Sequence, residues 1–382
     1  MNRSSRWIAV LVVAAFFAVP GPASAQLVTL PPDGDNQKAS VSQWIGLVEV
    51  TITYNSPDVT GPDGADRTGK IWGQLVPYGM ANLGFGTCGA NCPWRAGANE
   101  NTVFRVSHDV KVEGQSLPAG DYGLHMIPGP DEWTLVFSKN STSWGSYFYD
   151  AAEDALRVKV KPKAAAYTHW LTYEFTDRQP DRATVALRWE KLEVPWTITV
   201  DGMADLYVAN LRRELRSAPG FNWQAWEQAA RFCLDKKVNL AEALTWAQNA
   251  VSLPFIGRES FATLRTLADA QAANGLAAES EATLQKALEH PTAGVMDLHQ
   301  FGRQLLTRGD KDKALKVLEL NARKHPNAWP VNVGLARGYA AVGRTEDALK
   351  HAKLALAQAP DEVNRKNLEK LIQDLETAKP AK

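Results

Sequence analysis

The hydrophobic periodicity of this 382-residue chain changes once, near Asp201-Gly202. Before this point, apolar residues recur at every second position, which is the period of a half-buried β-strand. After it they recur at helical spacing, and alanine and leucine replace tryptophan and glycine as the typical residues. One chain with two periods in separate halves is expected to form two domains of different class.

The first half, from about residue 40 to residue 200, contains short alternating runs separated by turn signals such as Glu113-Gly114 and Gln179-Pro180. The predicted inward-facing sets are Val50/Ile52/Tyr54, Thr102/Phe104/Val106, Tyr122/Leu124/Met126, Trp133/Leu135/Phe137, Leu171/Tyr173/Phe175, Val185/Leu187/Trp189 and Val194/Trp196/Ile198/Val200. Short strands at this spacing are typical of an antiparallel sandwich or barrel with one apolar and one wet face.

The second half contains an internal repeat of 34 residues, seen in the equal steps between Gly275, Gly309 and Gly343. The clearest unit, residues 329–362, has small, aromatic and turn residues at Ala336, Tyr339, Gly343, Ala348, Ala355 and Pro360. This pattern resembles the tetratricopeptide repeat, a helix-turn-helix unit. We expect about four units, the first over residues 222–253, plus a capping helix over residues 363–377, because stacking buries faces that one helix pair leaves open.

The predicted fold is therefore an antiparallel β-sandwich or barrel-like domain followed by an all-α, tetratricopeptide-like solenoid. The expected order along the chain is a signal peptide (1–25), a linker (26–37), the β-rich domain (38–203), a connecting helix (204–220) and the repeats with their capping helix (221–378).

The first 25 residues have the features of a cleavable export signal. Arg3 and Arg6 precede an apolar run over residues 7–19, and Ala23-Ser24-Ala25 has the small-x-small form that signal peptidase cuts. A bilayer span needs about 20 residues, so we expect cleavage before Gln26 rather than a membrane anchor. The predicted location is periplasmic or secreted, with no membrane span after cleavage.

Cysteine content and charge restrict the chemistry. In an oxidising compartment, the closely spaced Cys88 and Cys92 are expected to form a disulfide; the alternative, a metal site, needs two more ligands that their loop does not supply. The charges balance, with 42 basic and 42 acidic residues, whereas a nucleic-acid-binding chain is expected to be basic. No common catalytic or phosphate-binding motif occurs, so no cofactor and no metal are expected.

The β half carries several distinctive segments: Gly69-Lys70-Ile71-Trp72-Gly73, Leu75-Val76-Pro77-Tyr78-Gly79, Trp94-Arg95-Ala96-Gly97-Ala98-Asn99-Glu100, and the tract from Leu117 to Pro128. Over about residues 38–200 it resembles a bacterial family catalogued as domain of unknown function 2911. The resemblance implies an exported β-rich domain, often fused to tetratricopeptide repeats, and no established activity. The chain departs from the family pattern at residues 58–66 and at residues 80–93, which contain both cysteines.

A ligand site is predicted around Arg95, Asn99 and Glu100, which offer guanidinium, amide and carboxylate groups in one loop. Their expected neighbours are Lys70, His125 and the indoles of Trp72, Trp94 and Trp144. A polar cluster with aromatic walls suits a sugar, an anionic headgroup or a peptide end. The alternative is structural: Arg95 pairs with Glu100 and Asn99 caps a turn. His125 alternates with Tyr122, Leu124 and Met126, so we expect it on the wetter face.

In the repeats, Arg303 and Arg337 occupy equivalent positions of successive units, and Arg265 and His299 lie one turn earlier in theirs. The resemblance to tetratricopeptide proteins places such positions in a concave groove that binds peptides or proteins. This cationic strip suits an acidic segment or a terminal carboxylate, although the residues depart from the carboxylate-clamping members of the family. The alternative is that these are solvated charges on a helix face.

Two functions follow from these sites. The first is a non-enzymatic exported binding protein, in which the repeats bind a protein or peptide and the β domain holds a small ligand or glycan. The second is a hydrolase-type enzyme that uses Arg95, Glu100 and His125. The sequence leaves the oligomeric state open.

Overall fold

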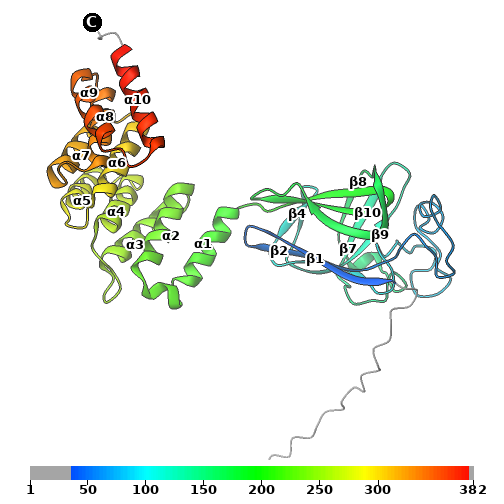
Figure 1. Ribbon diagram of the computed structural model, residues 1–382. Helices are drawn as coiled ribbons and strands as arrows, with labels where there is room; N and C mark the ends of the chain where they lie inside the picture. The colour runs from blue at the N-terminus through cyan, green and yellow to red at the C-terminus, as the bar shows by residue number, and fades with distance from the viewer. Residues whose placement is uncertain (1–35, 378–382) are drawn as a thin grey trace, which may run out of the picture. The chain divides into compact units, whose positions relative to one another are not determined.

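The computed structural model describes residues 36–377, which divide into two compact units, one ending at Asp201 and the other beginning at Gly202 (Figure 1). The predicted signal peptide, residues 1–25, and the predicted linker as far as residue 35 lie outside the described residues. Each unit is described separately below.

The first unit contains two antiparallel sheets. The larger has the strand order β1 (Gln37–Ile45), β2 (Val48–Ser56), β3 (Thr102–Val106), β6 (Gly120–Ile127), β7 (Trp133–Ser138) and β8 (Asp154–Val160). The smaller has the order β5 (Gln115–Leu117), β4 (Val110–Val112), β10 (Arg182–Thr199) and β9 (Lys163–Thr176). The predicted antiparallel, sandwich-like fold is confirmed.

Alternation decides which side chains form the core. In β2, Val48, Val50 and Ile52 are buried while the residues between them are partly exposed. All the predicted inward-facing sets are buried, and each large apolar side chain contributes roughly 1.5–3 kcal/mol by leaving water. The last two predicted sets lie on one strand, β10, which is interrupted by a change of register around Glu190, a residue in the left-handed backbone region (φ 55°).

The outer face of the larger sheet is covered beside β6 and β7. Cys88 and Cys92 form the predicted disulfide, with their Cα atoms 5.2 Å apart. They pack with Val136, on the outer face of β7, and with Tyr149, from the segment that follows β7. The face that the period of two identifies as wet is therefore locally a second apolar layer.

The second unit is all-helical. It begins with α1 (Met203–Glu214) and a short 3-10 turn (Ala218–Phe221). Four helix pairs and a last helix follow in the described residues: α2 (Trp223–Lys236) with α3 (Leu240–Ser252), α4 (Phe261–Ala273) with α5 (Ala277–Glu289), α6 (Val295–Arg308) with α7 (Lys311–Lys324), α8 (Trp329–Ala341) with α9 (Thr345–Ala357), and α10 (Glu362–Thr377) (Figure 1). This arrangement confirms the predicted solenoid.

The repeated glycines have a conformational role. Gly275, Gly309 and Gly343 follow the first helix of successive pairs, and their φ angles are 79°, 88° and 79°. Because only glycine adopts this left-handed region without a steric penalty, it ends the helix and turns the chain into the second helix. The step of 34 residues is therefore a record of three equivalent helix-to-helix turns.

Leu318 of α7 packs closely against glycines of two other helices. A methyl group added at Gly302 of α6 would lie 2.5 Å from Leu318 Cδ2, and methyl groups at Gly334 and Gly338 of α8 would lie 2.8 and 2.9 Å from Leu318 methyl carbons. These distances are shorter than van der Waals contact, so α6, α7 and α8 approach one another only because three side chains are missing.

We therefore expect Gly302→Ala to destabilise the repeat unit. Alanine gains about 0.5–1 kcal/mol in helix propensity, but overpacking against Leu318 costs about 1–3 kcal/mol, so the clash decides the sign. The measurement is unfolding followed by circular dichroism at 222 nm. In a Leu318→Ala background the added methyl group has room, and Gly302→Ala should there lose its penalty; an equal penalty in both backgrounds would contradict this packing.

Candidate functional site

A cavity of about 330 Å³ lies in the β unit beside the distinctive Trp94–Ala98 segment. Its walls come from three stretches, within residues 57–67, 75–83 and 92–98, with Ser146 and Trp189 completing the lining. This volume is at the lower end of the range of about 300–1,000 Å³ for small-molecule sites. Within residues 36–377, no three His, Cys, Asp or Glu side chains are grouped to hold a metal ion.

The backbone of the Trp94–Ala98 segment is held by both sheets. Trp94 and Met126 of β6 exchange two N–H···O hydrogen bonds of 2.8 Å. The Ala96 carbonyl accepts hydrogen bonds from Thr102 Oγ1 of β3 at 3.1 Å and from the Tyr173 hydroxyl of β9 at 2.7 Å. A side chain at Gly97 would meet Thr102 Oγ1 at 2.8 Å. The Ala-Gly pair of the motif therefore fixes the segment across the sandwich and positions its two neighbours, Trp94 and Arg95.

Arg95 lines the cavity and pairs with no carboxylate of the described chain. Its Nη1 donates to the Asn99 carbonyl at 2.6 Å, and its guanidinium carbon lies 5.0 Å from the centre of the Tyr147 ring. A methyl group at Gly145 would lie 2.5 Å from the guanidinium carbon. Glu100 accepts a hydrogen bond from Asn55 Nδ2 at 2.7 Å instead, so the expected Arg95–Glu100 pair does not form.

Four indoles lie together next to the cavity. The ring centres of Trp72, Trp94, Trp133 and Trp189 are separated by 5.1–6.5 Å. Trp94 and Trp189 line the cavity, and the predicted approach of Trp72 to Trp94 is found. Trp144 is 49% exposed and Lys70 is also exposed. Neither belongs to the cavity lining, so the predicted convergence of all the named side chains is only partial.

The expectation that His125 faces water is wrong. Its side chain is 1% exposed, because the loops that cover the outer face of β6 and β7 bury it. Nδ1 lies 3.1 Å from Ser146 Oγ, and the ring packs against Tyr149. Burial lowers the pKa of His125 to about 4, and the positive charge of Arg95 contributes. An imidazole with this pKa is a weak general base at neutral pH.

Ser146 is the lining residue that sequence reasoning missed. It is buried, lines the cavity and contacts His125. The only signal for it in the sequence is its place directly after Trp144-Gly145, a pair that the family resemblance also includes.

In the repeats, the structure separates the four predicted groove residues into two groups. Burial lowers the pKa of Arg337 on α8, and the charge of Arg303 on α6 lowers it further, so these two guanidiniums are close enough to repel each other. Neither makes a side-chain hydrogen bond or an ion pair among residues 36–377. His299 is 6% exposed; its burial lowers its pKa, as do the charges of Arg303 and then Arg337, although a hydrogen bond with the Pro330 backbone acts in the opposite direction.

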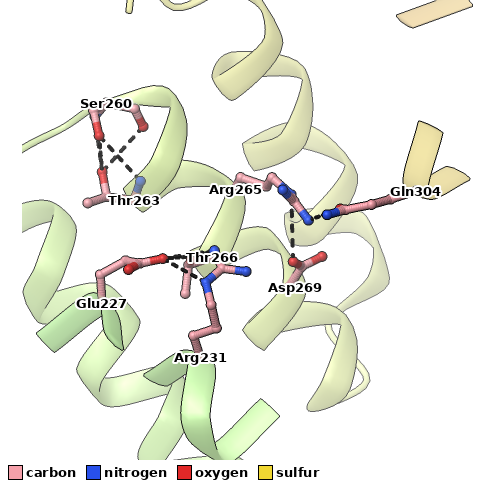
Figure 2. A network of polar contacts seen from close by, with 8 residues as sticks. All are labelled: Glu227, Arg231, Ser260, Thr263, Arg265, Thr266, Asp269 and Gln304. Carbon is pink, nitrogen blue, oxygen red and sulfur yellow. Dashed lines mark hydrogen bonds and ion pairs between the residues drawn. The ribbon is translucent and has the colours of Figure 1, made fainter. Parts of the chain in front are cut away.

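Arg265 is engaged between two helices, with a side chain that is 13% exposed. Its Nη2 donates to Gln304 Oε1 of α6 at 2.6 Å, its guanidinium carbon lies 4.8 Å from the centre of the Phe301 ring, and Asp269 lies 3.9 Å from its Nε (Figure 2). Arg265 and His299 are therefore packing residues, and the predicted strip of four cations is reduced to the pair Arg303–Arg337.

The preceding helix pair neutralises its own charges. Glu227 of α2 accepts hydrogen bonds from Arg231 at 2.8 Å and from the Thr266 hydroxyl of α4 at 2.7 Å (Figure 2). Positive charge that no described acidic side chain balances is thus found on α6 and α8, and not at this α2–α4 contact.

Comparison with known families decides what the first unit is. Residues 36–198 match the family described as "Protein of unknown function (DUF2911)". These residues form a DUF2911 domain. The match includes both sheets and the three stretches that line the cavity. No curated protein matches the chain.

Solved structures match part of the chain. MamA is 18% identical over 44% of this chain and 92% of its own length, with a TM-score of 0.29. YrrB, described as a TPR protein with an unusual peptide-binding site, is 20% identical over 44% of this chain and 84% of its own, with a TM-score of 0.28. A thermophilic TPR protein of Thermus thermophilus is 21% identical over 45% of this chain and 92% of its own, with a TM-score of 0.29. No helix in residues 36–377 has the length and hydropathy that a membrane crossing requires.

We expect His125 to make the DUF2911 domain sensitive to acid. Because its pKa is near 6.5 when unfolded and about 4 when folded, the unfolded state binds the proton first as pH falls. Stability from the neutral imidazole is complete above pH 7 and is lost between about pH 6.5 and pH 4. From pH 7 to pH 5 this loss is about 2 kcal/mol.

The measurement is denaturant unfolding followed by tryptophan fluorescence at both pH values, for the wild type and for His125→Gln. The variant lacks the titrating ring, so its stability should change less over this interval. An identical pH dependence in the two proteins would show that His125 does not carry the effect.

Proposed function

We propose that this chain is an exported, non-enzymatic binding protein. Its helical repeats bind an acidic segment of a protein or peptide, and its DUF2911 domain holds a small ligand. The observation that carries the proposal is the Arg303–Arg337 pair, two mutually repelling guanidiniums on the first helices of consecutive units, with no counter-ion from the part of the chain that the structure describes.

A partner carboxylate would relieve two unfavourable terms at this pair. Arg337 is partly withdrawn from water, and the charge of Arg303 raises its free energy further. A guanidinium presents a planar fork of donors that matches a carboxylate, and such charge-assisted hydrogen bonds are stronger than neutral ones. Stacked repeats present the first helices of successive units side by side, which extends the binding surface along a peptide.

The leader supports export, and the disulfide is consistent with it. Disulfides persist in oxidising compartments and are rare in the cytosol of most organisms. We therefore place the mature protein in the periplasm or outside the cell.

The hydrolase alternative receives less support from the geometry. Of its three proposed residues, Arg95 lines the cavity, but Glu100 is bonded to Asn55 and His125 is buried. The His125–Ser146 contact resembles a base and a nucleophile, yet the low pKa of His125 works against proton abstraction at neutral pH. We therefore favour binding over catalysis.

Selection from a displayed library of random dodecapeptides tests the repeat surface. The wild-type protein should enrich peptides with more Asp and Glu than the input library contains. Arg303→Gln combined with Arg337→Gln should lose that enrichment, because the acceptors' cationic partners are gone. Arg323→Gln, which removes an exposed guanidinium from α7, is the matched control and should keep it. Selection of neutral or basic peptides by the wild type would overturn the proposal.

The intact mass of protein expressed with its leader in a Gram-negative host tests export. The periplasmic fraction should contain a chain beginning at Gln26, with two hydrogens fewer than the fully reduced form because Cys88 and Cys92 are joined. Replacement of Ala23 and Ala25 by bulky residues should block processing. Full-length, unprocessed wild-type protein confined to the cytosol would contradict export.

A further inference from the structure

The DUF2911 cavity contains two guanidiniums that no carboxylate of the described chain neutralises. Arg67 and Arg95 both line it, and neither makes an ion pair within residues 36–377. Arg95 uses Nη1 for the Asn99 carbonyl, while its Nε and Nη2 make no hydrogen bond in the same range. The opposing charge in the lining is Asp58, whose carboxylate lies 3.6 Å from His169 Nε2. The lining therefore has two formal positive charges against one negative charge.

The rest of the lining is apolar and aromatic. Trp94 is partly exposed and is held by the neighbouring indoles, with its ring centre 5.7 Å from that of Trp72 and 6.5 Å from that of Trp189. Leu75 and Leu83 contribute aliphatic surface. A fixed indole beside aliphatic side chains favours a flat apolar group, because aromatic faces stack with offset geometry and lose little entropy on binding.

We propose that this cavity binds a small organic anion, in which a carboxylate or a similar group contacts Arg95 and Arg67 and a flat apolar body packs on Trp94. This inference rests on the proposed function, since it names the class of ligand that the DUF2911 domain holds. The volume of about 330 Å³ limits the body to a small ring system.

The disulfide holds one wall of the site. Cys92 lines the cavity, and its backbone exchanges hydrogen bonds of 2.9 and 3.0 Å with Ala81, which also lines it. Leu83 comes from the same loop. Opening the five-residue ring from Cys88 to Cys92 is therefore expected to loosen this wall and weaken binding without removing either arginine.

The test uses the mature full-length protein and saturation-transfer NMR, with 2-naphthoate as the anionic probe and 2-naphthamide as its neutral match. Naphthoate should bind on the order of tenfold more tightly than naphthamide, as expected for hydrogen bonds to a charged group. Arg95→Gln and Arg67→Gln should each reduce this preference severalfold, and Arg95→Lys, which keeps the charge and loses the fork, should give an intermediate value. Cys88→Ser with Cys92→Ser should weaken naphthoate binding in the same assay.

Two controls keep the result interpretable. Arg178→Gln removes an exposed arginine from the turn between β9 and β10, and Arg303→Gln with Arg337→Gln alters only the repeats; both should bind naphthoate as the wild type does. Each variant is compared with the wild type by circular dichroism, so that loss of folding is recognised as such. Equal affinity for acid and amide, or an unchanged preference in both Arg95→Gln and Arg67→Gln, overturns the proposal.

A neutral saccharide, N,N′,N″-triacetylchitotriose, separates this inference from the proposed function. If it binds and is lost in Arg95→Gln while naphthoate does not bind, the domain holds a small ligand but the anionic class is wrong. If none of the three probes binds, both the inference and the small-ligand part of the proposed function fail.

Discussion

The β domain depends on one backbone carbonyl that two sheets share. Ala96 lies in an irregular segment, yet its oxygen accepts hydrogen bonds from Thr102 on the larger sheet and from Tyr173 on the smaller one. Both donors are buried, and a buried polar group left without a partner costs about 1–3 kcal/mol. This shared acceptor ties a loop to the sandwich core and thereby gives Trp94 and Arg95 fixed positions at the cavity.

The two units handle arginine in two different ways. Where an arginine has a structural role, the chain supplies acceptors: Arg188 contacts Glu174 and Glu193, and Arg265 contacts Gln304 and Asp269. At the cavity and on α6–α8, Arg67, Arg95, Arg303 and Arg337 have no carboxylate partner among the described residues. An uncompensated and partly buried cation is unfavourable in the free protein, and this is the physical reason to look for anions at both places.

The sequence predicted the features that depend on local periodicity and failed on those that depend on long-range covering. A period of two correctly identified Val50, Leu124 and the other inward-facing residues, and a period of 34 identified the helix pairs. The same alternation put His125 on the opposite face, which was right, but it carries no information on whether that face meets water. The loops that bury His125 include one from residues 80–93, more than thirty positions away in the chain.

A similar limit applies to the candidate sites. Trp94 and Arg95 were found because a distinctive motif marked them, whereas Lys70 and Trp144 were included by residue type and lie outside the cavity. In the repeats, equivalent positions correctly related Arg303 to Arg337. They did not show that Phe301 and Gln304 hold Arg265, or that α8 covers His299, because such contacts depend on the depth at which neighbouring helices pack.

The glycines around Leu318 determine more than local packing. Gly302 directly precedes Arg303, and Gly334 and Gly338 flank Arg337. The distance between the two guanidiniums is therefore governed by how closely two bare helix backbones approach, and only secondarily by the long arginine side chains. Related proteins that keep both arginines but carry alanine at these glycines would hold the charges farther apart and would be matched to a differently spaced pair of acidic groups.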